Sequence, residues 1–327
     1  DVVEAIDPVA HELGGACRLF GDRLVGGSRG RDGDHPRGVR VGHDRGGGHD
    51  REQAPLLRAS ERELGQPVNV VNRTGGSGVV GHAAIASAPA DGYTIGLATV
   101  EIGMMHWQGL TELSGASYTP IGLVNADPAG INVRADAPYK TVQDLLAAVK
   151  ANPGKASFGT PGSGGQNHFL GVQFAKIAGI DLPMTPYKGT PPMITDLLGG
   201  HVPAGISLMD ELIKHQKSGK LRVIGIFSDK RSELMPDIPT FAEQGFAVAS
   251  GDGWTAMWAP AKTPPAEIAR VQQALQKILA NPQVKEYLMT RLSVVPHYRS
   301  AEEMAKAQRD ELATWEPIIK ASGFKPD

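Results

Sequence analysis

Strand-like and helix-like patterns alternate along most of this chain, and this alternation limits the folds available to it more than any other feature. From about residue 54, short apolar runs bounded by Gly, Pro or Asp-Gly alternate with longer amphipathic segments. Strands that alternate with helices are typical of parallel sheets, because parallel neighbours need a long crossover, usually a helix. A chain of 327 residues also exceeds the usual size of one core, so the sequence predicts an α/β fold of two lobes with mostly parallel sheets.

End signals place many of these elements. We expect strands at residues 68–71, 93–99, 157–160 and 221–227. We expect helices at residues 56–64, 79–87, 142–151, 167–177, 190–198, 265–280 and 301–321. Thr141 with Asp144, and Ser300 with Glu303, have the spacing of a capping box at two helix starts. The side chains expected to form the apolar face of the helix near residue 167 are Phe169, Leu170, Phe174 and Ile177.

Residues 1–53 depart from this pattern. From Gly21 to Gln53, 25 of 33 residues are Gly, Arg, Asp or His, and such a segment buries too little apolar surface to offset its ordering entropy. Two interpretations stay open: a solvated leader, or a stretch of a GC-rich gene translated out of frame. The His-Asp pairs at residues 43–44 and 49–50 lack a third ligand on an ordered scaffold, so we expect no metal there.

Composition excludes several classes of function. A formal net charge of −2 gives no electrostatic reason to expect nucleic acid or an anionic membrane as partner. No apolar run approaches the roughly 18 residues of a membrane span. The single cysteine, Cys17, excludes an intrachain disulfide and a cysteine-based zinc site. The first ten residues lack the pattern of a secretory signal, so either a signal was removed or there was none.

Residues 76–81 match G-x-G-x-x-G, and Glu101 follows 20 residues after the last glycine, where a ribose-binding acid would lie. This pattern favours an NAD(P)-linked oxidoreductase as the alternative function. However, residues 72–75 separate the motif from the preceding strand, and a tight turn with close helix packing explains the glycines equally well. The nucleophile elbow G-x-S-x-G is missed by one glycine at both Ser163 and Ser77, so an esterase is a weaker alternative.

The loop of residues 162–168 is the most informative segment. It joins a strand ending at Thr160 to a helix beginning near Asn167. Its glycines allow close approach of the backbone to a ligand, and the free N–H groups and dipole of the helix start favour an anion. Ser163 and the polar side chains of residues 166–168 add possible hydrogen bonds. The loop therefore predicts an anion site that needs no basic side chain, although an ordinary glycine-rich loop stays an alternative.

The segment 186–190 repeats this arrangement before the next helix, and Tyr187 adds an apolar face with a polar tip. Two such loops facing one cleft would form a small-anion site built mainly from backbone. Trp254 and Trp258 could line the same cleft, although core packing is expected for at least one of them.

Nine short segments match one family in the same order along the chain. They are LGQPV at 64–68, NR at 72–73, ADGYT at 90–94, ANPGK at 151–155, GSG at 162–164 with His168, PYKG at 186–189, TDLLGG at 195–200, GKLR at 219–222 and PDIPT at 236–240. From about Leu56 to its end, the chain resembles the extracytoplasmic solute receptors of the tripartite tricarboxylate transporter family, the Bug receptors. The resemblance implies a Venus flytrap that holds a small carboxylate or dicarboxylate between two lobes. It also implies delivery of the ligand in the periplasm to membrane permease subunits, without a chemical step.

The resemblance also implies a set of site residues. The loop 160–168 matches a family loop that binds a ligand carboxylate, and residues 187–189 match the second-lobe edge of the cleft. Residues 99–101 match a polar loop, where Glu101 departs from the usual Ser and Thr, and Ser207 replaces a common Asp. With Trp254 added, the expected ligand-binding residues are Thr99, Glu101, Thr160, Gly162, Ser163, Gly164, Gly165, Gln166, Asn167, His168, Tyr187, Lys188, Gly189, Ser207 and Trp254. We expect no cofactor and no catalytic residue.

The largest departure from the family is at the N-terminus. Family members begin with a hydrophobic strand and a Pro-Gly-Gly-rich loop that supplies half of the carboxylate clamp. Here Gly46-Gly47-Gly48 is similar to that loop, but we expect no hydrophobic strand ahead of it. We therefore hypothesise that residues 1–53 are a frame-shifted form of a normal first strand, which leaves open a receptor that has lost binding.

The expected organisation follows. Residues 54–124 and 227–327 form the first lobe, residues 125–226 form the second, and two crossing strands form the hinge. We expect a periplasmic monomer that does not insert into the membrane.

Overall fold

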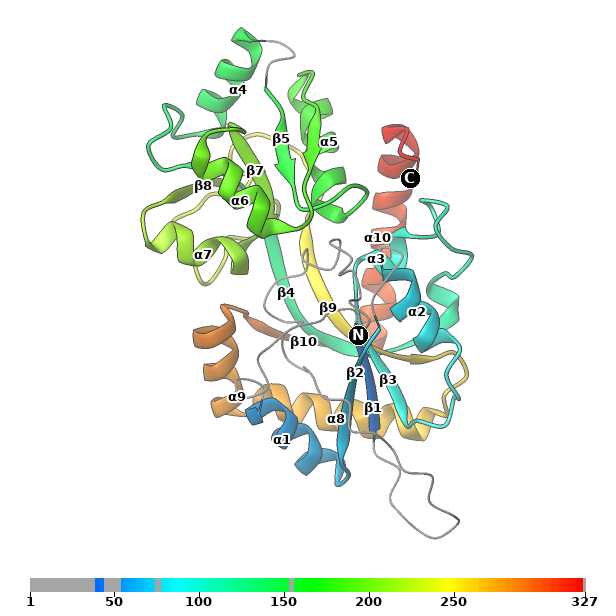
Figure 1. Cartoon of the computed structure of the whole chain (residues 1–327). Helices are drawn as coiled ribbons and strands as arrows, with labels where there is room; N and C mark the ends of the chain where they lie inside the picture. Colours follow the sequence, from blue (N-terminus) through cyan, green and yellow to red (C-terminus); the bar gives the residue numbers. More distant parts are fainter. Residues whose placement is uncertain (1–38, 44–53, 74–77, 153–155, 326–327) are drawn as a thin grey trace, which may run out of the picture.

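The computed structural model describes residues 39–43, 54–73, 78–152 and 156–325 (Figure 1). They form two lobes joined by a long strand, β4 (Tyr118–Arg134), and by its antiparallel neighbour β9 (Asp252–Pro260). In the described part of the chain, no helix is both long and apolar enough to cross a membrane.

The first lobe is built on a sheet with the strand order β2-β1-β3-β9-β4, and β10 also pairs with β4. The pairs β1–β2 and β1–β3 are parallel, whereas β3–β9, β9–β4 and β4–β10 are antiparallel. The other strands of this sheet are β1 (Val39–His43), β2 (Val68–Asn72), β3 (Thr94–Thr99) and β10 (Pro296–Ser300). Its helices are α1 (Ala54–Leu64), α2 (Val79–Ala86), α3 (Glu101–Met104), α8 (Pro265–Ala280), α9 (Pro282–Tyr287) and α10 (Ala301–Ser322).

The second lobe continues from the other half of β4. Strand β7 pairs antiparallel with β4 and parallel with β5, which pairs parallel with β6, and β8 pairs antiparallel with β4. These strands are β5 (Phe158–Thr160), β6 (Met184–Pro186), β7 (Ala204–Leu208) and β8 (Leu221–Ile226). The helices are α4 (Val142–Ala151), α5 (Gln166–Ala178), α6 (Thr190–Gly199) and α7 (Met209–Lys217). The expected parallel strands therefore lie toward the outside of each sheet, and antiparallel pairs lie where the lobes join.

Strand β4 belongs to both sheets. Residues 118–128 pair with β9, and residues 129–134 pair with β7 and β8. One hydrophobic cluster extends along this strand through both lobes, from Ala98 and Trp315 on one side to Phe158 and Phe169 on the other. Because these side chains are buried together, the junction of the lobes is packed like a domain core.

Most expected helices and strands are confirmed to within a few residues. Both capping boxes are present, with Asp144 N–H donating to Thr141 Oγ1 at 3.1 Å and Glu303 N–H donating to Ser300 Oγ at 3.3 Å. Ile177 was expected to face the core but is 41% exposed, although Phe174 and Ala175 beside it are buried.

A strand lies ahead of Gly46, where we expected no hydrophobic strand. Residues Val39–His43 form β1, which pairs with strands on both sides. Backbone hydrogen bonds do not depend on side-chain type, so a strand forms within a segment of poor apolar content. Gly46 to Gly48, Cys17, His49 and Asp50 lie outside the described residues, and the frame-shift hypothesis stays a prediction.

The segment after Phe227 packs on the second lobe, although we expected it in the first. Phe241 is fully buried, with its ring centroid 5.1 Å from that of Phe174 in α5 and 4.3 Å from that of Phe227. Its N–H donates to the carbonyl of Ile226 at 3.0 Å. Phe241 thus belongs to the same core as Phe174 and Phe227 in the second lobe. We therefore propose that the boundary between the lobes lies near Gly251.

The Phe241→Ala variant tests this boundary. Removing a fully buried ring is expected to destabilise the protein by about 3–5 kcal/mol, measured by chemical denaturation. Amide exchange should accelerate in α5 and β8 while β3 and α8 stay protected. Met289→Ala, at a side chain that is 39% exposed, is the matched control and should change little. Equal loss of protection in both lobes would contradict the boundary at Gly251.

Candidate functional site

Two loops of the second lobe lie together at the carboxyl ends of neighbouring parallel strands. Residues 161–165 follow β5, and residues 187–189 follow β6. Tyr187 N–H donates to the carbonyl of Thr160 at 2.8 Å, and Gly189 N–H donates to that of Pro161 at 2.8 Å. The two segments singled out from the sequence are therefore held side by side, at the end of a parallel sheet where ligands commonly bind.

Each loop leads into a helix whose start carries no side-chain cap within the described chain. The cap residues are Gly165 for α5 and Gly189 for α6. The first N–H groups of a helix lack an intrahelical partner and carry the positive end of the dipole. In α6 the residues after Thr190 are Pro191 and Pro192, which have no N–H, so Thr190 is the donor of its first turn. Gly164 has φ 76° and Gly189 has φ 94°, a backbone region that side chains rarely adopt. The two glycines thus allow the loops to expose backbone donors toward an anion.

The loop side chains divide into buried and exposed groups. Thr160 is fully buried and donates from Oγ1 to the carbonyl of Gly162 at 2.9 Å, which fixes the start of the loop. Ser163 is exposed, whereas Gln166 and Asn167 are buried. In the described part of the chain, Asn167 Oδ1 and His168 Nδ1 are buried without a hydrogen-bond partner. Buried polar atoms of this kind at a helix start suit a site that receives a polar ligand.

His168 adds no charge to this site at neutral pH. Burial lowers the pKa of its imidazole below the ordinary 6.5, because the charged form loses its solvation. Its ring lies 5.6 Å from that of Phe169 in an edge-to-face arrangement. His168 therefore offers a hydrogen-bonding atom and an apolar face to a ligand.

Tyr187 and Lys188 have different environments. The Tyr187 hydroxyl donates to Asp196 Oδ2 at 2.9 Å, and burial together with this carboxylate raises the pKa of Tyr187 to about 12. Lys188 is exposed. The Tyr187 hydroxyl is thus bonded within its own lobe, and Lys188 is an exposed cation within the second loop.

The first lobe contributes the segment that begins at the end of β3. Thr99 Oγ1 donates to Glu101 Oε2 at 2.5 Å, so the carboxylate that could repel an anion is hydrogen-bonded locally. Farther along, Gln108 Nε2 donates to the carbonyl of Gly164 at 2.6 Å. The segment 99–108 and the loop 161–165 therefore approach each other from opposite lobes.

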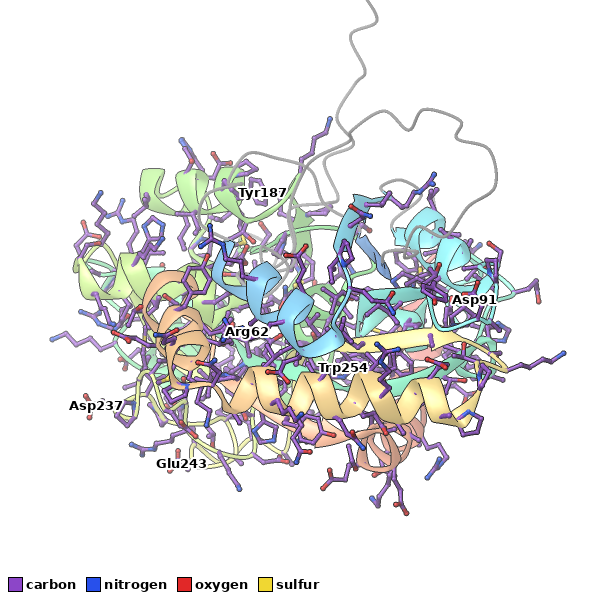
Figure 2. All side chains as sticks on the ribbon, turned by 90° about the horizontal axis from the view of Figure 1, so that it is seen from below. Arg62, Asp91, Tyr187, Asp237, Glu243 and Trp254 are labelled. Atoms are coloured by element: carbon purple, nitrogen blue, oxygen red, sulfur yellow. The ribbon has the colours of Figure 1, made fainter. Side chains whose placement is uncertain are left out.

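Ser207 and Trp254 are buried in the sheets. Ser207 is fully buried in β7, and its Oγ accepts from Asn132 Nδ2 of β4 at 3.4 Å. Trp254 is 5% exposed, with its ring 6.0 Å from that of Trp258 in the core between the lobes. Figure 2 labels both Tyr187, in the loop after β6, and Trp254, in β9. Packing in the interior of the sheets accounts for the burial of Ser207 and Trp254. Contact of these two residues with a ligand stays a prediction.

Sequence reasoning missed an acidic cluster beside the loops. Asp210 N–H donates to Asp127 Oδ2 at 2.8 Å, and Thr190 Oγ1 at the start of α6 donates to Glu211 Oε2 at 2.7 Å. Burial, followed by the charge of Asp210, raises the pKa of Asp127 well above its ordinary 3.8. Asp210 lies two residues after the end of β7, in the first turn of α7, and this placement after a parallel strand was the available signal. Asp127, within an apolar run, gave none.

The dinucleotide interpretation does not fit the sheet. In a dinucleotide fold, the ribose-binding acid follows the strand adjacent to the one that carries the glycine loop. Here β1 lies between β2 and β3, so Glu101 is one strand removed from the glycines after β2. Gly78 has φ 92° at the start of α2, as the tight-turn alternative requires, while Gly76 and Ser77 lie outside the described residues.

The described residues contain no group of three or more His, Cys, Asp or Glu side chains that could hold a metal ion. His43 belongs to β1, and its partners in the proposed His-Asp pairs are not among these residues.

Comparisons with known proteins show which family and structures this chain is similar to. Residues 56–324 match the family described as the tripartite tricarboxylate transporter family receptor. Protein BugT of Bordetella pertussis is 31% identical over 284 residues, which cover 86% of this chain and 87% of that protein. The structure of the periplasmic binding protein BugD has a TM-score of 0.75 and 28% identity, covering 90% of this chain and 100% of that one. The R. palustris protein Rpa4515, solved with adipate, has a TM-score of 0.77 and 25% identity, with coverage of 90% and 100%.

The raised pKa of Asp127 predicts a pH-dependent stability. Its carboxyl group holds a proton more tightly in the folded protein than in the unfolded chain, so its contribution to stability falls as pH rises above about 4. Asp127→Asn removes this ionisation and can still accept from Asp210 N–H through its amide oxygen. As pH rises above about 4, we expect the variant to lose less stability than the parent, measured by thermal unfolding.

Asp237→Asn, at an exposed carboxylate, is the matched control and should follow the parent protein at every pH. Parallel pH profiles of the parent and Asp127→Asn would contradict the prediction.

Proposed function

The chain belongs to the tripartite tricarboxylate transporter receptor family, and from this membership we propose that it captures a small carboxylate or dicarboxylate between its two lobes. In this proposal the loaded receptor acts outside the cytoplasm and delivers the ligand to membrane permease subunits. Binding is the whole of its task, without a cofactor or a catalytic residue, and the receptor acts as a monomer.

The observation that carries the proposal is the pair of glycine-capped helix starts, α5 and α6, held together at the ends of β5 and β6. The first N–H groups of α5 and the N–H of Thr190 in α6 can donate to the two oxygens of a carboxylate, and the helix dipoles favour its charge. The loop 160–168 contains no Lys or Arg. Recognition by backbone suits a receptor, because it binds a charge without the strong ion pair that would slow release.

The similarity to Rpa4515 favours a dicarboxylate as the ligand, and the acidic side chains near the loops restrict where its second carboxylate can lie. The structure of Rpa4515 contains adipate, and its fold aligns over 90% of this chain. The acidic side chains Asp127 and Glu211 lie next to α6 and α7, so a second carboxylate is expected on the side of the loops away from them. The first lobe would then supply the remaining contacts through residues 99–108.

A receptor that has lost binding is the second interpretation. The family loop that follows the first strand corresponds here to residues 44–53, which lie outside the described part of the chain. Strand β1 itself has its neighbours on both sides, which supports a functional first lobe.

A ligand screen tests the proposal directly. Adipate and other dicarboxylates are expected to raise the melting temperature, because a ligand at about 100 times its Kd stabilises the folded state by about 2.7 kcal/mol. Intrinsic fluorescence of Trp254 and Trp258 should respond to the same ligands. NADH is the negative control. Stabilisation by NADH with no response to any carboxylate would reverse the assignment, and no response to either would favour the decayed receptor.

A substitution series tests how the carboxylate is held. Gly164→Val is expected to weaken binding most, because φ is 76° and an ideal Cβ would lie 2.5 Å from Cζ of Phe324. Lys188→Ala should weaken binding modestly, because solvent screens an exposed charge. Ser163→Ala should fall between them, losing about 0.5–1.5 kcal/mol for one hydrogen bond. Affinities for adipate by calorimetry give the ranking.

Gly65→Val is the matched control for backbone strain. Gly65 has φ 66°, nothing lies within 4 Å of its ideal Cβ, and it lies at the end of α1. This variant should lose stability but keep affinity. If Lys188→Ala abolished binding while Gly164→Val retained it, a salt bridge would replace the backbone as the basis of recognition.

A further inference from the structure

The C-terminal end of the chain contacts the carboxylate-binding loop of the opposite lobe. Helix α10 is followed by Gly323 with φ 68°, and the next residue, Phe324, packs against the start of α5. Its ring centroid lies 5.6 Å from that of Phe169 and 6.3 Å from that of His168, both nearly edge to face. Figure 1 shows this end of α10 reaching the side of the second lobe.

Helix α10 itself is anchored on the first lobe. It packs against α3 and β4, and its side chains Trp315 and Ile319 are each 3% exposed. Near its end, Lys320 Nζ lies 4.9 Å from the ring centroid of Trp107, in the segment after α3. Phe324 is therefore held in place by the first lobe while its ring contacts the second.

The fit between Phe324 and Gly164 is close. An ideal Cβ on Gly164 would lie 2.5, 2.9 and 3.2 Å from three ring atoms of Phe324. The ring thus occupies the space that a side chain at residue 164 would need. At this residue the backbone is in the left-handed region, which other residues rarely adopt.

Gln108 fixes the same residue by a hydrogen bond. Its side chain is 6% exposed, and Nε2 donates to the carbonyl of Gly164 at 2.6 Å. A carbonyl held by a buried donor cannot rotate without breaking that bond, so the peptide between Gly164 and Gly165 is held in one orientation. This peptide directly precedes the first N–H groups of α5.

We propose that Phe324 and Gln108 are positioning residues, which hold the loop 162–168 in the backbone conformation that receives the carboxylate. Both residues are carried by the first lobe, so the conformation of the binding loop depends on the arrangement of the two lobes. This inference rests on the proposed function for its ligand, but the positioning of the loop can be measured without a ligand.

Phe324 is a suitable residue to test because its position is peripheral. The ring is half-buried at the end of the chain, beyond the last turn of α10. Its removal is expected to affect the loop that it contacts more than the global stability. This expectation separates positioning from simple core packing, for which stability and binding would fall together.

The experiment compares Phe324→Ala, Phe324→Leu and Lys325→Ala. Phe324→Ala should weaken adipate binding roughly tenfold, because two edge-to-face contacts are lost. Amide exchange in residues 162–168 of the ligand-free protein should accelerate, while exchange in β3 and α8 stays unchanged. Phe324→Leu keeps apolar bulk and should recover part of both effects. Lys325→Ala, at the exposed neighbour, should match the parent in both.

A double-mutant cycle tests the contact with Gly164. Gly164→Ala alone places a Cβ against the ring, and Phe324→Ala creates room for it. The double variant should therefore bind adipate more tightly than the two single effects combined would predict. Gln108→Ala should also accelerate exchange at residues 162–168, because the carbonyl of Gly164 loses its donor.

The outcomes are distinct. If Phe324→Ala left both loop exchange and adipate affinity as in the parent, or if it destabilised both lobes as much as the loop, the inference would be overturned. If the parent protein bound no carboxylate, the proposed function would fail. The exchange of residues 162–168 in the ligand-free variants would then still decide whether Phe324 and Gln108 position the loop.

Discussion

The arrangement of the whole protein depends on the continuous hydrogen-bonding of strand β4. This strand has 17 residues, and it pairs with β9 and β10 in the first lobe and with β7 and β8 in the second. A strand shared by two sheets fixes how the lobes face each other, because neither half can shift its register without moving the other. The hydrophobic cluster along β4, which includes Trp254 and Trp258, adds apolar packing to this constraint.

That shared strand brings two kinds of groups close to the junction of the lobes. The starts of α5 and α6 carry partial positive charge, while Asp127 and Glu211 provide carboxylates next to them. The helix dipoles act over about one turn, so their effect is local to the loops. Burial disfavours the charge of Asp127, which reduces its repulsion of an anion. The site can therefore accept a carboxylate beside an acidic cluster.

Local signals in the sequence predicted local structure well. The capping boxes at Thr141 and Ser300 depend on residues three apart, and both were confirmed. Two crossing strands were expected, but the bounds of β4 and β9 were not predicted. Pro120, Gly122 and Pro128 interrupt the apolar pattern of β4, and the pairing partners are distant in sequence. Strand β1 was missed for a related reason: its neighbours β2 and β3 supply the hydrogen bonds, and its own composition gives little indication of burial.

The sequence by itself determined the family, the two-lobed α/β fold and the position of the glycine-rich loops, because these depend on short ordered motifs and on periodicity. The tertiary structure decided which other residues reach those loops. Gln108 meets Gly164 from 56 residues away, and Phe324 meets it from the end of the chain. Such contacts depend on the path of β4 through both lobes. A local sequence pattern cannot predict which residues meet in space when they are far apart along the chain.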